Sequence, residues 1–206
     1  MPAADDWQIL LAAWNEELLS DEEITGDLPL DVVQSRWLGY APASDEQIRQ
    51  AERRLGLSLP HSYRSFLRVT NGWRATGYSI SRVRPIQEVD WFRVENSGWA
   101  EISISAYRGL GPIPDADYFV YGEGQRSPVY RAEYLLSAVQ ISDVGDSAVY
   151  LLNPEVRTET QEWEAWLYAT WLAGAARHRT FWDMMQAEYD AYRDLKRGDG
   201  QAGRTE

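Results

Sequence analysis

The spacing of apolar residues changes at Asn71-Gly72, and this change limits the chain to a fold with helices before a sheet. Up to Asn71, apolar side chains recur every three or four residues, as on one face of an α-helix. After Gly72, apolar and polar side chains alternate, which is typical of strands with one buried face. The helical spacing returns near the C-terminus. N-terminal helices, a central antiparallel sheet and a closing C-terminal helix predict an α+β fold.

The first and last helices are predicted from their apolar stripes. Trp7 and Leu11 begin a stripe that indicates a helix over about 6–19. Acids, Gly and Pro are mixed over 20–43, so we expect a connection there with at most short helical turns. The closing helix is expected over about 178–196.

Two short helices are expected to meet at a proline. Ser44 and Gln47 are spaced as a capping box, which predicts a helix over 45–55. The next helix begins at Pro60, whose missing N–H is tolerated in a first turn, and ends at Asn71.

The middle of the chain predicts several strands joined by tight turns. A Gly-Asp turn at 143–146 and Asn153-Pro154 separate consecutive strands, so a meander is the economical topology. The candidate strands are 78–83, 100–105, 117–121, 136–142, 147–152 and 161–169.

Composition excludes several kinds of chemistry. The 206 residues include no Cys and two His, so we expect no thiol nucleophile, no disulfide, no metal site and no cofactor. The acidic N-terminus lacks the basic region of a secretory signal, and no apolar run is long enough to cross a bilayer. These features predict a cytoplasmic protein that does not bind a membrane.

The net charge of −12 is concentrated at the N-terminus. Residues 1–35 carry nine acids and no base, whereas from Arg36 onward 23 acids face 20 bases. Nucleic acid is an unsuitable partner because its binding needs clustered Lys and Arg. A basic protein is the natural alternative.

Paired carboxylates remain as the one enzymatic hypothesis. Asp143 with Asp146, or Glu162 with Glu164, would act as acid and base on a glycoside. Turn geometry explains the first pair, and we expect the second pair on the solvated face of a strand, so structural roles are favoured over catalysis.

The tryptophans are expected to divide between core and surface. Large side chains fill the interior of a compact domain, and Trp37, Trp166 and Trp182 are predicted to lie there. Trp73, directly after the Asn-Gly exit, is predicted to be exposed.

The order of two sequence blocks resembles that of a known family. AERRLGLSLPHSYRSFLRVTNGW (51–73) and ISDVGDSAVYLLNP (141–154) resemble the two signature blocks of the SUKH superfamily, the Smi/Knr-like domain. The likeness covers about 40–195. It implies a SUKH-like domain over 40–196, which follows the acidic helix and connection over 1–39. The tail over 197–206 lacks core residues and is expected to be disordered.

The resemblance also implies which residues hold the fold. These structural residues are Leu59, Pro60, Tyr63, Phe66, Asn71, Gly72, Gly145 and Asp146. No partner-contacting residue transfers by motif. The first 35 residues and the stretch around 100–130 correspond least to the family, so specificity is expected there.

The function implied by the resemblance is protein binding without catalysis. Bacterial members are largely immunity proteins that neutralise a cognate toxin, often a nuclease with a basic cleft. Eukaryotic relatives regulate cell-wall synthesis and signalling, which stays open as an alternative. The expected contacts with a basic toxin are Glu16, Glu17, Asp21, Glu22, Glu23 and Trp73.

Overall fold

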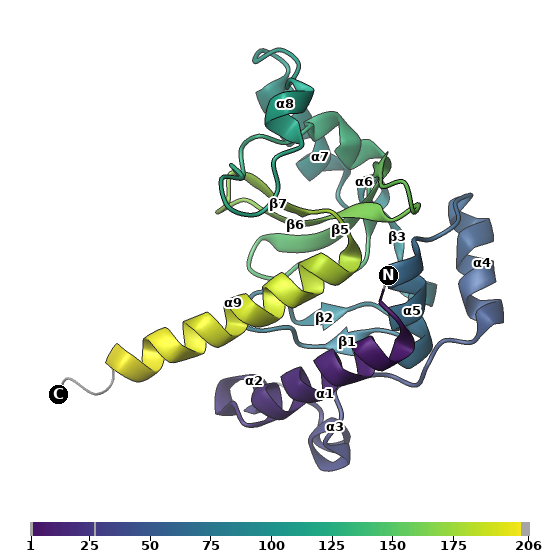
Figure 1. Ribbon diagram of the computed structural model, residues 1–206, viewed down its shortest axis with the longest axis vertical. Helices are drawn as coiled ribbons and strands as arrows, with labels where there is room; N and C mark the ends of the chain where they lie inside the picture. Colours follow the sequence, from purple (N-terminus) through teal and green to yellow (C-terminus); the bar gives the residue numbers. More distant parts are fainter. Residues whose placement is uncertain (1, 27, 203–206) are drawn as a thin grey trace.

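The computed structural model describes residues 2–26 and 28–202 and has an antiparallel sheet at its centre, with helices on both sides (Figure 1). The strands are β1 (Trp73–Arg74), β2 (Arg82–Val83), β3 (Asp90–Trp91), β4 (Val139–Gln140), β5 (Ala148–Arg157), β6 (Trp163–Ala169) and β7 (Gly174–His178). The five-stranded sheet has the order β3-β4-β5-β6-β7 with antiparallel neighbours, so the predicted meander is confirmed. The turn expected at Asn153-Pro154 is wrong, because both residues lie within β5. A separate two-stranded sheet pairs β1 with β2.

Helices precede, interrupt and follow the strands. The α-helices are α1 (Ala4–Leu19), α2 (Glu22–Gly26), α3 (Leu30–Ser35), α4 (Asp45–Leu55), α5 (His61–Val69), α6 (Phe92–Glu95), α7 (Ser97–Tyr107), α8 (Asp115–Tyr118) and α9 (Phe181–Ala202). Short 3-10 turns are η1 (Ile86–Glu88) and η2 (Ala132–Leu136). The predicted helices correspond to α1, α4, α5 and α9, and the fold is α+β as expected.

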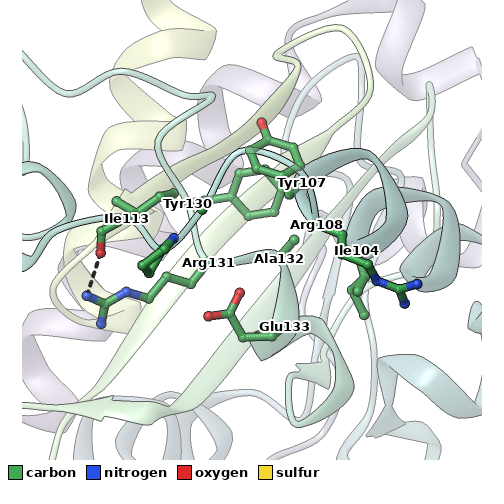
Figure 2. Close-up of a pocket in the computed structure, with 10 residues that line it drawn as sticks. Ile104, Tyr107, Arg108, Ile113, Tyr130, Arg131, Ala132 and Glu133 are labelled. Carbon is green, nitrogen blue, oxygen red and sulfur yellow. Dashed lines mark hydrogen bonds between the residues drawn. The ribbon is translucent and has the colours of Figure 1, made fainter.

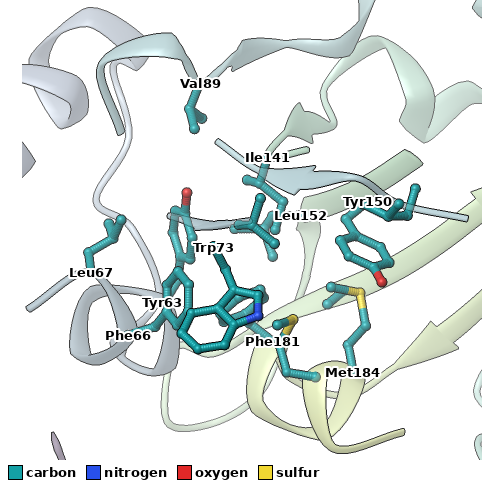
Figure 3. Close-up of a cluster of buried hydrophobic side chains, with 14 of the residues drawn as sticks. Tyr63, Phe66, Leu67, Trp73, Val89, Ile141, Tyr150, Leu152, Phe181 and Met184 are labelled. Atoms are coloured by element: carbon teal, nitrogen blue, oxygen red, sulfur yellow. The ribbon is translucent and has the colours of Figure 1, made fainter. Parts of the chain in front are cut away.

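Alternate residues of β5 enter two different cores, because successive side chains of a strand point to opposite faces. Tyr150 joins a large core with α1, α5 and α9, whereas Val149 and Leu151 join a smaller core with α6, α7 and η2. Figure 3 shows the large core, in which the rings of Phe66 and Phe181 lie 5.3 Å apart between centroids. The sheet is therefore buried on both faces.

Helix α4 begins and ends with the capping contacts that the sequence predicts. The Ser44 hydroxyl accepts from the backbone N–H of Gln47 at 3.2 Å, and the Gln47 side chain accepts from the backbone N–H of Ser44 at 2.7 Å. Gly56 ends the helix with φ of 68°, a left-handed conformation that favours glycine. The predicted bounds of 45–55 are confirmed.

The N-terminal helix is part of the large core. Trp7, Leu11 and Trp14 are completely buried and pack in the same cluster as α5 and α9. The Asn15 side chain accepts from the backbone N–H of Leu38 at 2.9 Å, which fixes the connection beneath α1. The acidic segment is thus folded onto the body of the domain.

Two predicted strands are helices instead. The segment 100–105 lies in α7, where Ala100 and Ser103 are buried one turn apart and Ile102 is 72% exposed. Small side chains at that spacing let a helix lie close to the second core, although the Ile-Ser alternation imitates a strand. The segment 117–121 includes the end of α8, which follows Pro114.

The strand boundaries also differ from the prediction. The expected strand over 78–83 is reduced to β2, because Ala75 has φ of 70° and the chain between β1 and β2 forms a turn. Strand β7 was not predicted, and it delays the start of the last helix to Phe181. That helix continues to Ala202, into the expected tail, and residues 203–206 of the tail lie outside the described residues.

Candidate protein-binding site

The N-terminal acids divide into an internal and an external set. Tyr189 donates to Glu17 at 2.8 Å, and both Tyr78 and Tyr192 donate to Asp21, at 2.8 and 3.0 Å. Burial alone would raise the pKa of Asp21, but the hydrogen bonds from the two tyrosines and from the Glu23 backbone N–H, together with the charge of Lys196, lower the pKa below its ordinary value. These two acids therefore tie the end of α1 and the residues that follow it to α9.

The external set consists of Glu16, Glu22 and Glu23, whose side chains are exposed. Glu16 lies near the end of α1, and the other two form the first turn of α2, where the helix dipole favours negative charge. These three of the six expected contacts are available to a partner.

The expectation that Trp73 is exposed is wrong. Its side chain is completely buried in the large core, where its ring packs edge-on against Trp37 with centroids 5.2 Å apart. The cause is Gly72, whose φ of 104° turns the chain so that β1 enters the core directly after the helix. Of the tryptophans expected inside, Trp166 is completely buried, whereas Trp37 and Trp182 are partly buried.

An exposed tyrosine separates two hollows beside the acids. Tyr78 is 40% exposed at the turn between β1 and β2. On one side, the α2 hollow has a volume of about 160 Å³ and includes Glu23 in its lining. On the other side, the α9 hollow has a volume of about 110 Å³ and is bordered by Trp171 and Leu195, which are 52% and 59% exposed. Acidic and aromatic side chains therefore gather around this turn.

The α9 hollow contains a carboxylate that sequence reasoning did not single out as functional. Glu188 lines it and accepts a hydrogen bond of 2.6 Å from the hydroxyl of Tyr150, which lies 2.9 Å from the Thr76 hydroxyl. Burial raises the pKa of Glu188 to about 7, although the Tyr150 hydrogen bond acts in the opposite direction. The sequence held one indication of this role, because Glu188 lies on the apolar stripe of the closing helix, where a charged side chain is unusual.

A third hollow lies in the segment that corresponds least to the family. It has a volume of about 340 Å³ and is lined by the end of α7, the following loop and η2 (Figure 2). Arg131 donates to the carbonyl of Ile113 at 3.0 Å and pairs with Asp115, so its guanidinium is already engaged. The lining also mixes exposed Arg108 with exposed Glu133, so it favours neither sign of charge.

The first candidate catalytic pair is held in structural roles. Asp143 accepts from Arg82 at 2.7 Å and from Arg84 at 2.8 Å. Burial acts to raise the pKa of Asp143, but the two arginines lower it below its ordinary value. Asp146 is exposed in the turn with φ of 47°, and its carbonyl accepts from the Trp171 indole at 3.0 Å.

The second pair was expected on a solvated face, and this is wrong. Glu162 and Glu164 are 3% and 1% exposed. A β-bulge in β5 shifts the register between Asn153 and Arg157, opposite the start of β6. Glu162 turns toward the N-terminus of α5, and Glu164 lies among polar groups beneath α8. The donors to Glu164 are Tyr118, Tyr121, Asn153, Trp166 and Arg177.

Neither a metal centre nor a membrane span emerges from the described part of the chain. Among the side chains described for residues 2–26 and 28–197, no three His, Asp or Glu are grouped so as to hold a metal ion. Over the same residues, no helix combines the length and the apolar content that a bilayer crossing requires.

The structural residues of the two sequence blocks lie where the helices meet the sheet. Leu59, Tyr63 and Phe66 are buried in the large core, and the Asn71 side chain accepts from the backbone N–H of Ile86 at 2.8 Å. A side chain at Gly145 would meet the Ser79 carbonyl at 2.1 Å, so this turn needs glycine to approach the β1–β2 turn.

Together, these packing contacts and the antiparallel meander define an α+β domain of the Smi/Knr-like class. The chain belongs to the SMI1 / KNR4 family (SUKH-1), whose sequence model matches residues 42–187. A comparison with curated proteins gave no match. The match begins after the N-terminal acids and ends at residue 187, so it includes the turn with Tyr78 and the first turns of α9, but not α1, α2 or Glu188.

Proposed function

We propose that this chain is a non-enzymatic immunity protein that binds and neutralises a basic toxin. The observation that carries the proposal is the surface around Tyr78, where exposed Glu23 lines the α2 hollow and Trp171 borders the α9 hollow. Glu16 and Glu22 are exposed at the end of α1 and the start of α2. We call this the Tyr78 surface and define it by Glu16, Glu22, Glu23, Tyr78, Trp171 and Leu195. Acids accelerate association with a basic partner, and aromatic side chains slow its release.

The absence of catalysis is supported by the engagement of the candidate carboxylates. Asp143 is paired with two arginines, and Glu162 and Glu164 are buried in hydrogen-bonded positions. An acid and base pair for glycosides needs access to substrate and to water. A buried pair offers neither.

A nuclease is the toxin type that suits this surface best. Its active cleft is basic because it binds phosphates, and carboxylates held on a rigid surface occupy such a cleft as phosphate mimics. Family members in eukaryotes instead regulate cell-wall synthesis, and that role would use the same kind of surface on an endogenous partner.

Co-expression tests the proposal directly. The candidate toxin is taken from a neighbouring open reading frame that encodes a secretion domain and a C-terminal toxin module, and it is expressed in a host with and without this protein. We expect cells to survive only when this protein is present. Survival that does not depend on it would remove the immunity role, and capture of an endogenous cell-wall enzyme in its place would favour the regulatory role.

Charge reversal of the exposed acids tests whether the toxin binds at the Tyr78 surface. The variant Glu16→Lys/Glu22→Lys/Glu23→Lys changes exposed side chains only, and Glu17 and Asp21 are left intact because they fix α1 against α9. We expect association with the toxin to slow about tenfold or more and to depend less on salt. The control variant Glu101→Lys/Glu123→Lys/Glu155→Lys carries the same change at other exposed acids. Equal rates for both variants would move the contact away from the Tyr78 surface.

A further inference from the structure

The α9 hollow has the chemistry of a pocket for a single cation. Its border is formed by the aromatic side chains of Tyr78, Trp171 and Tyr192 together with Leu195. Its volume of about 110 Å³ suits the end of one side chain rather than a peptide segment. The one carboxylic acid among its described lining residues is Glu188, and none of these residues is basic.

Only one of the two oxygens of the Glu188 carboxylate accepts a hydrogen bond within the described residues. Its Oε2 accepts the 2.6 Å hydrogen bond from Tyr150. Among residues 2–26 and 28–197, whose side chains the structure describes, Tyr150 is the one hydrogen-bond donor to this carboxylate, and it contacts Oε2 rather than Oε1. A carboxylate has room for about four donors. The Tyr150 bond fixes the group in place and leaves one oxygen for a ligand.

The basic side chains nearby are committed to other partners. Lys196 lies 4.0 Å from Asp21 and donates to the carbonyl of Glu17 at 3.3 Å. Arg193 lies 3.5 Å from Glu17. Neither lines the α9 hollow, so the charge of Glu188 is not balanced by an ion pair within the described chain.

We propose that the α9 hollow receives a cationic side chain of the partner protein, with arginine as the preferred residue. A guanidinium is planar, so it stacks on aromatic rings and donates to a carboxylate at the same time. Burial of the acid strengthens this attraction, because the effective dielectric constant is lower than in water. The pocket is the anchor point of the Tyr78 surface, and exposed Glu23 of α2 lines the other hollow, to which Tyr78 also contributes.

The assignment of the cation to a partner rests on the proposed function, but the pocket itself can be tested without a toxin. Ethylguanidinium chloride is the probe, titrated into the full chain at about pH 8, where a group with a pKa near 7 is largely ionised. NMR signals of the Trp171 indole and of Glu188 report binding. We expect saturable shifts, and we expect the neutral isostere ethylurea to bind about tenfold more weakly or not at all.

Two variants and one control complete this test. Glu188→Gln keeps an acceptor for Tyr150 and removes the charge, so we expect guanidinium binding to weaken about tenfold. Leu195→Lys places a cation at the exposed border without touching either core, and we expect the same loss. Asp190→Asn removes an exposed charge from the same helix and is expected to bind as the unaltered protein does.

The outcomes separate the pocket from the function. Equal binding to Glu188→Gln, or equal binding of ethylurea, would overturn the cation pocket even if the protein protects cells from the toxin. Guanidinium binding that depends on Glu188, in a protein that gives no protection, would remove the immunity role and keep the pocket. If both hold, Glu188→Gln is expected to raise the Kd for the toxin about tenfold.

Discussion

Glu162 caps helix α5 from a position 100 residues away in sequence. Its carboxylate accepts from the backbone N–H of Ser62 at 2.9 Å and from the Ser62 hydroxyl at 2.6 Å. The residue before this helix is Pro60, which has no side-chain acceptor, so the cap comes from the turn that precedes β6. The cap ties the first sequence block of the family to the sheet.

Removing this cap should destabilise the whole domain. We expect Glu162→Ala to lower the free energy of unfolding by about 1–3 kcal/mol, because it leaves the first turn of α5 with unsatisfied buried donors. Urea denaturation measures the loss. Glu159→Ala, in the exposed part of the same turn, is the matched control and should change stability by less than about 0.5 kcal/mol. A similar loss in both variants would contradict a specific capping role.

The buried pair of Glu164 and Arg177 predicts a non-additive result. Both side chains are completely buried and lie 3.2 Å apart between Arg177 Nη1 and Glu164 Oε1. Glu164→Gln leaves a buried guanidinium without its anion, so we expect a loss of about 3 kcal/mol. Adding Arg177→Met should recover part of that loss, because no unpaired charge is then buried. Strictly additive losses in a double-mutant cycle would show that the pair is not coupled.

The raised pKa of Glu188 predicts a pH-dependent gain in stability on its replacement. Burial raises this pKa to about 7 from an ordinary value of 4.5. The side chain therefore favours the folded state below about pH 4.5, and this contribution is lost as the pH rises through about 7. Glu188→Gln cannot ionise. We expect its stability relative to the unaltered protein to rise by about 1–3 kcal/mol between about pH 5 and about pH 8.

Thermal or urea unfolding at both pH values checks this difference. His178, whose pKa burial lowers to about 4, titrates in both proteins and cancels in the comparison. A difference that stays constant across this range would show that Glu188 ionises at its ordinary pKa.

Replacement by alanine should change the free energy of unfolding in opposite directions at two glycines. Gly72 has φ of 104°, and a Cβ there would meet the Val83 carbonyl at 2.7 Å. We expect Gly72→Ala to cost about 1–3 kcal/mol. Gly98 lies in α7 with open space around it, and Gly98→Ala should add about 0.5–1 kcal/mol. Denaturation of both variants measures the two effects, and a tolerated Gly72→Ala would show that β1 can enter the core by another path.

Sequence periodicity was reliable where an element buries one face against a single layer. Helix α4 has its predicted bounds because its cap and its apolar stripe are local signals. The same method failed for α7, where the buried face consists of Ala100 and Ser103. Small residues give a weak apolar signal, and the exposed Ile102 gave a misleading one.

The candidate site was predictable only in part. The concentration of acids before Arg36 is visible in the sequence, but their division into internal and external sets depends on α9. Tyr189 and Tyr192, which engage Glu17 and Asp21, come more than 170 residues later. No local pattern contains such a contact.

The sequence by itself determined the α+β order, the meander, the capping of α4 and the family, because these depend on spacing between near neighbours. Only the tertiary structure decided which polar groups are buried. Trp73 is inside, Glu162 and Glu164 are inside, and Glu188 borders a hollow beside Tyr78. Burial depends on which elements pack together, and packing between distant segments also sets the charge state of a carboxylate.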